Sequence, residues 1–390
     1  MNSRARAAPC HATLFCLGLA TACATPTTTA TPPLRPADTS AATDGTSSVN
    51  PVARAPSRVG AVLESARAHH GVPALGAAIV RSAGVEVVEV SGVRHRRRGD
   101  AVTREELWHL GSDTKAMTAT LVAMLVEEAD DVSWDAPVTA LFAGLDVDVD
   151  PAWREITLQM LLDHRGGLPA NIDAITSASS RAGMDPRAHR ATMIATLLAA
   201  PPESAPGIFA YSNVGYTMLG ALLERRWDAD FEALMASRLW RPLGMARCGF
   251  GGPGEGNARG HVGGVAQGAA FDNPPIIAPA GTAYCSLEAW AAFVGLHLRA
   301  ARGESELLSA PSFAHLHTPK EGETYAGGWI VVEREGDGRI LTHDGSNTAW
   351  YAHAVLVPAH DLAVLVTSNA GLPDGQAAVM EAAEAILKLE

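Results

Sequence analysis

The sequence predicts an α+β fold, in which one antiparallel sheet is built from both chain ends, flanked by helices, and interrupted by an inserted mainly helical region. Strand-like patterns occur near both ends of the chain, and helical patterns fill the middle. Such a separation of strands from helices is typical of α+β proteins. Hydrophobic residues make up 47% of the 390 residues and charged residues 18%, which indicates a well-buried globule rather than a disordered chain.

The first elements of the globule follow from the spacing of apolar residues. An amphipathic pattern runs to His70, two strand-like runs are separated by a Ser-Ala-Gly turn, and apolar residues recur at helical spacing after Ser112. The expected elements are a helix over 58–70, strands over 74–80 and 85–90, and a helix over 112–128.

The centre of the chain, 155–245, has mainly helical patterns, and the stretch 246–283 is rich in Gly and Pro and is expected to form loops. The helices expected in and after this region lie over 187–199, 213–226, 230–240 and 286–301.

The last part of the chain returns to strands. Turn-like connections at 336–338 and 359–361 are short, so the strands that flank each of them are expected to be antiparallel neighbours. The expected elements are strands over 327–335, 339–344, 351–358 and 362–369, followed by a helix over 374–388.

The N-terminus has the pattern of a secretory signal peptide over 1–24. Arg4 and Arg6 precede an apolar run over 12–24, which is too short to span a bilayer. Cleavage after the A-x-A sequence that ends this run predicts simple secretion. The segment LATAC instead resembles a lipobox, which predicts membrane attachment by a lipid at Cys23.

A linker is expected between this segment and the globule. Residues 25–58 are rich in Thr, Pro, Ala and Ser and lack apolar periodicity, which predicts a disordered tether. The remaining residues, 59–390, form the expected domain. We therefore expect an exported protein of the periplasm or cell envelope.

Charge and cysteine content narrow the class of protein further. The net charge of −12 gives no electrostatic reason to expect a nucleic-acid partner. Two of the five cysteines leave with the signal peptide, and Cys23 is lipidated or lost with it. Cys248 and Cys285 remain, and they predict either one disulfide in an oxidising compartment or two separate buried thiols.

A rare lysine marks the first candidate catalytic group. Only three of the 30 basic residues are lysines, and Lys115 stands three positions after Ser112, which places both side chains on one face of a helix. A serine hydroxyl becomes a good nucleophile when a nearby base takes its proton. Lysine can be that base, whereas arginine stays protonated. The simpler interpretation is a serine cap beside a solvated lysine.

Two further motifs carry polar groups suited to catalysis. Tyr211 and Asn213 form a Y-S-N triplet before a helical pattern; a phenol can relay protons and an amide can hold a substrate carbonyl. The simpler interpretation is a packed tyrosine beside an Asn cap. His343, Asp344 and Gly345 end a predicted strand, where a glycine allows close approach of a backbone.

These motifs, in the order S-x-x-K, Y-x-N and H-x-G, resemble the set found in serine β-lactamases and penicillin-binding D,D-peptidases. The segments LLDHRGGLP (161–169), WRPLGM (240–245) and 346–369 resemble the class C-like branch, which also holds family VIII esterases. The resemblance covers about 59–390 and implies the same sheet-plus-helical-domain architecture.

The resemblance also implies a role for each motif residue. Ser112 would be the acylated nucleophile, and its N–H would form an oxyanion hole with that of Ser346. The remaining roles would be proton transfer by Lys115 and Tyr211, contact with a substrate amide by Asn213, and substrate binding by His343 and Gly345, with His343 in the place of the usual lysine.

Two departures from the family pattern bear on substrate. The third motif is H-D-G instead of K-T-G, so the anchor for a β-lactam carboxylate is only partly charged at neutral pH. Asp344 is repulsive to such a carboxylate if it faces the same site. The second motif is Y-S-N, whereas class C enzymes typically have Y-A-N. Both changes favour the peptidase and esterase members.

We expect no cofactor and no metal ion. The sequence contains no H-E-x-x-H, and the pairs His69-His70 and His315/His317 are interpreted as exposed helix residues because no third ligand stands near them in the sequence.

The expected function is an exported serine hydrolase that forms an acyl-enzyme on Ser112 and acts on esters or on D-amino-acid peptides and amides, as small molecules or peptidoglycan-type substrates. One alternative is a true class C-like β-lactamase. Another is a non-catalytic penicillin- or peptidoglycan-binding module. The sequence leaves the native substrate and the oligomeric state open.

Overall fold

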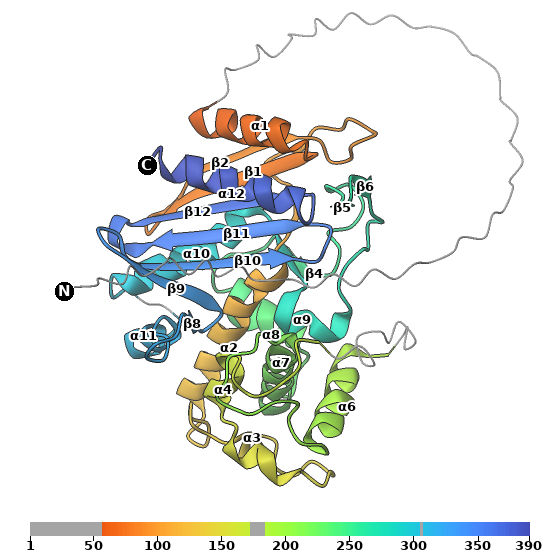
Figure 1. Cartoon of the computed structure of the whole chain (residues 1–390), viewed down its shortest axis with the longest axis vertical. Coiled ribbons are helices and arrows are strands. Elements are labelled where there is room, and N and C mark those ends of the chain that lie inside the picture. Colours follow the sequence, from red (N-terminus) through yellow and green to blue (C-terminus); the bar gives the residue numbers. More distant parts are fainter. Residues whose placement is uncertain (1–56, 172–183, 305–306) are drawn as a thin grey trace, which may run out of the picture. The chain divides into compact units, whose positions relative to one another are not determined.

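A computed structural model of the chain describes residues 57–171, 184–304 and 307–390 (Figure 1). The predicted signal peptide, the lipid site at Cys23 and the linker as far as residue 56 lie outside the described residues. Helix α1 (Arg58–His70) begins one residue before the predicted domain boundary, because the Ser57 side chain caps it by accepting a hydrogen bond from the Gly60 N–H. Within the described ranges, no helix is both long and apolar enough to cross a membrane.

The main sheet has seven strands in the order β2-β1-β12-β11-β10-β9-β8, and every neighbouring pair is antiparallel. The strands are β1 (Ala74–Arg81), β2 (Gly84–Gly92), β8 (Tyr325–Ala326), β9 (Trp329–Arg334), β10 (Gly338–Ser346), β11 (Tyr351–Val357) and β12 (Leu362–Ser368). Because β1 pairs with β12, both chain ends build this sheet (Figure 1), which confirms the predicted α+β architecture.

The two faces of the sheet pack against different helices, and strand alternation decides which residues face each layer. On β12, Val364 and Val366 join the apolar cluster of α1 and α12 (Asp374–Leu387). Ala363 and Leu365 face the opposite layer, which contains α2 (Thr114–Glu128) and α10 (Leu287–Ala301). Strands β11 and β12 are therefore buried along their whole length.

In the sequence, the mainly helical region is inserted between strands β2 and β8 of this continuous sheet, as predicted. Its central helix is α7 (Asn213–Trp227), which is buried from Val214 to Glu224. The described residues of this part of the chain also form α3 (Val138–Leu141), α4 (Leu158–Leu162), α6 (Pro186–Leu198), α8 (Phe231–Leu234), which continues as a π-helical turn to Trp240, α9 (Ala278–Gly281) and α11 (Ala310–Leu316).

Several short strands were not predicted, because two or three residues are too few to show an alternation of apolar and polar side chains. Strands β3 (Trp108–His109), β7 (Ala283–Cys285) and β4 (Cys248–Phe250) form a second sheet in that order, so the stretch predicted as loops contains strand residues. Strands β5 (His261–Val262) and β6 (Val265–Ala266) form a small hairpin. Cys248 and Cys285 face each other across β4 and β7 and form a disulfide, which confirms that alternative.

Candidate active site

Ser112 lies in a 3-10 turn (Gly111–Asp113) that runs directly into α2, so the serine precedes the helix instead of lying in it. The end of β10 packs closely against this turn. Gly111 has a φ of 51°, and a Cβ at this position would lie 2.2 Å from the backbone N of Ser346. A Cβ at Gly345 would lie 1.8 Å from the Leu110 carbonyl oxygen. Both glycines are therefore required for β10 to approach the turn that carries Ser112.

Lys115 lies in the first turn of α2 and is fully buried. Its Nζ lies 3.1 Å from Ser112 Oγ, 2.7 Å from Asn213 Oδ1 and 2.7 Å from the Ala280 carbonyl oxygen. The structure thus brings Ser112, Lys115 and Asn213 together through a single amine, although Asn213 is 98 residues away from the lysine. The alternative of a solvated lysine is wrong.

The Y-S-N triplet forms the start of α7. Ser212 is the N-cap, and its Oγ accepts a hydrogen bond from the Gly215 N–H and donates one to the Pro169 carbonyl. The Asn213 amide is held from both ends, since its Oδ1 accepts from Lys115 and its Nδ2 donates to Asn171 Oδ1 at 2.9 Å. The Tyr211 ring lies beside the same amine, with its centroid 4.8 Å from Lys115 Nζ.

A buried aromatic cluster backs the triplet, and two of its members were not predicted as site residues. The ring of His164 lies 4.2 Å from that of Tyr211 and 4.6 Å from that of Tyr325, measured between centroids. His164 Nδ1 accepts a hydrogen bond from the Ser212 N–H at 3.0 Å, so this histidine fixes the start of α7. Burial, together with the charge of Lys115, holds the pKa of His164 well below its ordinary value, and the ring is neutral.

His343 lies on β10 and is buried beside the same cluster; its ring centroid is 6.4 Å from that of Tyr211. Its Nδ1 donates to the Asp344 carbonyl oxygen at 2.8 Å, which leaves Nε2 to accept from the Tyr325 hydroxyl at 3.3 Å. Burial and the charge of Lys115 lower the pKa of His343 to about 4, although Asp344 acts in the opposite direction. The expectation of a partly charged histidine is therefore wrong, because His343 is neutral at pH 7.

Asp344 lies on the other face of the sheet from His343, as strand alternation requires. Its carboxylate accepts a hydrogen bond from Nδ1 of His353, its partner on β11, at 2.8 Å. Burial raises the pKa of Asp344, but the His353 hydrogen bond and charge outweigh it and hold the pKa below its ordinary value. Asp344 is thus a charged residue directed away from the Ser112 side, and it places no carboxylate beside a bound substrate.

A polar network of His109, Asp272 and Asn347 holds the turn before Ser112 in place, and the sequence did not reveal it. His109 Nδ1 accepts from the Gly111 N–H at 3.0 Å, so Nε2 carries the ring proton and faces Asp272 Oδ1 at 2.6 Å. The same carboxylate oxygen accepts from the side-chain amide of Asn347 at 3.1 Å. The network therefore joins the segment before the serine to the residue after Ser346. No local pattern links these positions, which lie far apart in the sequence.

Histidines elsewhere in the described residues differ in their surroundings. His315 stacks on Trp134 and His317 forms a buried hydrogen bond with His297, so the predicted exposure of this pair is wrong.

Among the residues that the structure describes, one group of three imidazole and carboxylate side chains converges closely enough to hold a metal ion. It lies on α1 and α12, apart from Ser112.

Comparisons with known proteins identify the family to which the chain belongs. A model of the Beta-lactamase family matches residues 59–387. The chain is 27% identical to unguisins hydrolase ungD' of Aspergillus campestris over 69% of this chain and 53% of the relative, and 26% identical to esterase EstB of Burkholderia gladioli over 54% and 56%. It thus spans about half the length of these curated relatives.

A solved structure, the octameric penicillin-binding protein homologue from Pyrococcus abyssi, superimposes with a TM-score of 0.69 at 23% identity and covers 85% of this chain and 77% of that one. At this identity the likeness concerns the fold, which is β-lactamase/transpeptidase-like. Because the family match extends over nearly the whole described globule, the chain belongs to the Beta-lactamase family.

Proposed function

We propose that this chain is a serine hydrolase that forms an acyl-enzyme on Ser112 and acts on esters or on D-amino-acid peptides and amides. The observation that carries the proposal is the buried Lys115 amine, which contacts Ser112 Oγ at 3.1 Å and two further oxygen atoms. A serine with a buried amine at hydrogen-bond distance is the arrangement that nucleophilic catalysis requires.

The partners of Lys115 favour a role as base. Asn213 Oδ1 and the Ala280 oxygen are carbonyl oxygens, which can only accept hydrogen bonds. A neutral amine has two N–H groups and one lone pair. In its charged form the amine donates to Ser112 Oγ as well as to these carbonyls. Once the amine has lost a proton, two N–H groups can still donate to the carbonyls while the lone pair accepts the proton of the Ser112 hydroxyl.

The reaction would then proceed in two halves. Ser112 Oγ attacks the substrate carbonyl carbon while its proton passes to Lys115, and the negative oxygen is stabilised by the N–H groups of Ser112 and Ser346. The proton reaches the leaving group through Lys115 and Tyr211, whose ring lies beside the amine. In the second half, water attacks the carbonyl carbon of the acyl-enzyme while its proton passes to the same base, and the acid and the Ser112 hydroxyl are released. Asn213 and the backbone at Gly345 would hold the substrate.

Substrate preference follows from the state of His343. In the family pattern a lysine at this position anchors a substrate carboxylate, but a neutral imidazole supplies no positive charge. We therefore favour esters and peptides that do not depend on such an anchor over β-lactams. The name of one relative, esterase EstB, agrees with this preference. Export to the periplasm or cell envelope, lipid attachment at Cys23 and peptidoglycan-type substrates belong to the same proposal and rest on the sequence alone.

The test is turnover of three substrate classes by the wild type and by Ser112→Ala. We expect a chromogenic short-chain ester or a D-Ala-D-Ala peptide to be hydrolysed, a cephalosporin to be hydrolysed poorly, and the variant to be inactive with an unchanged circular dichroism spectrum. A kcat/KM of roughly 10⁴ M⁻¹s⁻¹ or more for the cephalosporin would identify a true β-lactamase. Binding of penicillin without turnover of any of these substrates would identify a binding module.

A further inference from the structure

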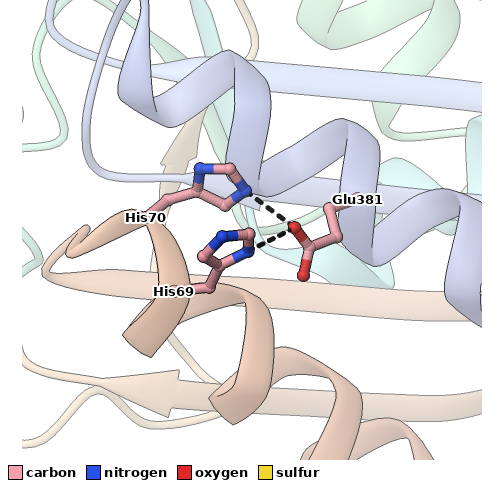
Figure 2. Close-up of side chains that lie close together, drawn as sticks. All are labelled: His69, His70 and Glu381. Carbon is pink, nitrogen blue, oxygen red and sulfur yellow. Dashed lines mark hydrogen bonds and ion pairs between the residues drawn. The ribbon is translucent and has the colours of Figure 1, made fainter.

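The structure supplies a third potential ligand to the pair His69-His70. Both histidines end helix α1, and Glu381 projects toward them from helix α12 (Figure 2). His69 Nδ1 and His70 Nε2 each lie 2.8 Å from the same oxygen, Glu381 Oε2. More than 300 residues separate the carboxylate from the imidazoles, which is why the sequence offered no third group.

This convergence is unusual for consecutive residues of a helix. Neighbouring side chains on a helix point about 100° apart and do not face each other. Here one ring presents Nδ1 and the other Nε2, and the ring centroids lie 4.5 Å apart. The three ligand atoms lie within 4.8 Å of one another, so they surround one point between the two helices.

We propose that His69, His70 and Glu381 form a binding site for a transition-metal ion of the zinc class, which ties the first helix of the domain to the last. Two imidazoles and one carboxylate are ligands that zinc prefers, whereas calcium and magnesium prefer oxygen ligands only. A tetrahedral zinc ion with bonds of about 2.1 Å separates its ligands by about 3.4 Å. The imidazoles and the carboxylate must therefore move apart by roughly half an ångström, with water as the fourth ligand.

The surroundings favour a cation at this point. The C-terminal end of a helix carries partial negative charge, and both histidines stand in the last turn of α1. The side chains are 68%, 21% and 40% exposed for His69, His70 and Glu381, which leaves access for the ion and freedom for a small adjustment.

The two helices that carry these ligands pack against each other. Leu63 and Ala66 of α1 share one apolar cluster with Ala378 and Ala382 of α12, so the two helices are packed together before any ion binds. Metal binding would thus cross-link elements from the two ends of the domain. The site lies over the face of the sheet opposite α2, and its function is independent of the reaction proposed for Ser112.

Zinc binding to the metal-stripped, untagged full chain tests the site. Isothermal titration should give about one Zn²⁺ per chain, and the melting temperature should rise with zinc concentration. The single variants His69→Ala, His70→Ala and Glu381→Gln should each weaken binding by at least about tenfold. Glu384→Gln is the matched control, because Glu384 lies one turn farther along α12 and pairs with Lys388 instead.

The results of these titrations distinguish a specific zinc site from adventitious zinc binding and from no binding at all. Retained affinity in Glu384→Gln with loss in the three ligand variants supports the proposal. Absence of zinc binding, or equal affinity in the wild type and the ligand variants, overturns it; the second result would mean an adventitious ion only. Hydrolytic activity should be the same with and without zinc, so failure of this proposal leaves the proposed function untouched.

Discussion

The amine of Lys115 lies 3.1 Å from the hydroxyl oxygen of Ser112, and it also contacts the carbonyl oxygens of the Asn213 side chain and of Ala280, each at 2.7 Å. Arginine at this position would keep a positive charge but could not take the serine proton. We expect Lys115→Arg to lower kcat/KM for esters by roughly 10²–10⁴-fold, the usual contribution of a general base. The measurement is steady-state kinetics of ester hydrolysis. Lys320→Arg, which replaces an exposed lysine, is the control and should keep the wild-type rate.

If Lys115→Arg instead retained most of the wild-type rate, the lysine would act through its charge alone. The neutral-amine mechanism would then have to be abandoned, although Ser112 could still be the nucleophile.

His343→Lys tests the basis of substrate preference. The change introduces a positive charge where the wild type has a neutral imidazole, so substrates with a carboxylate should gain more than neutral ones. We expect kcat/KM for a cephalosporin, relative to that for a neutral ester, to rise by at least about fivefold, or ~1 kcal/mol, the upper value for a solvent-exposed charge pair, because residue 343 is buried and less screened by water. His343→Gln remains neutral and should leave the ratio unchanged. Equal effects of both variants on the ratio would show that charge at this position does not select substrates.

The low pKa of His343 also predicts a pH dependence of stability. An unfolded histidine titrates near pH 6.5, whereas in the folded protein the pKa is about 4. Because the folded pKa is lowered, the stability linked to His343 is fully present above about pH 6.5 and is lost as the pH falls toward 4. Relative to His343→Gln, the wild type should lose up to about 1.4 kcal/mol of unfolding free energy per pH unit in this window.

Urea unfolding of both proteins at several pH values between 4 and 8 measures this difference. A difference that stays constant from pH 8 to pH 4 would mean that His343 titrates alike in the folded and unfolded chain, contrary to its buried environment.

The main sheet and the Ser112–Lys115 pair could be predicted because local patterns encode them. The long strands are largely apolar runs bounded by short turns, apolar residues of α2 recur at helical spacing, and the two catalytic candidates are three residues apart. Strands β3 and β7 are two and three residues long, and they pair with each other although more than 170 residues separate them, so no local pattern predicts them.

Other parts of the site depend on contacts that a single sequence does not reveal. His164 appeared only within a segment of family resemblance, and its bond to the Ser212 N–H spans 48 residues. The neutral state of His343 results from its burial. In the sequence, the adjacent Asp344 suggested instead that the imidazole would carry a partial charge. The opposite directions of the His343 and Asp344 side chains could have been predicted from the sequence, because consecutive residues of a strand point to opposite faces of the sheet.

Covalent labelling of Ser112 tests the proposed mechanism most directly. The protein is incubated with a reactive fluorophosphonate, its intact mass is measured, and the modified peptide is sequenced by mass spectrometry. We predict a single adduct on Ser112, no adduct in Ser112→Ala, and an adduct still on Ser112 in Ser346→Ala, which keeps the backbone N–H of residue 346. An adduct on another residue, or equal labelling of the wild type and Ser112→Ala, would contradict the assignment of Ser112 as the nucleophile.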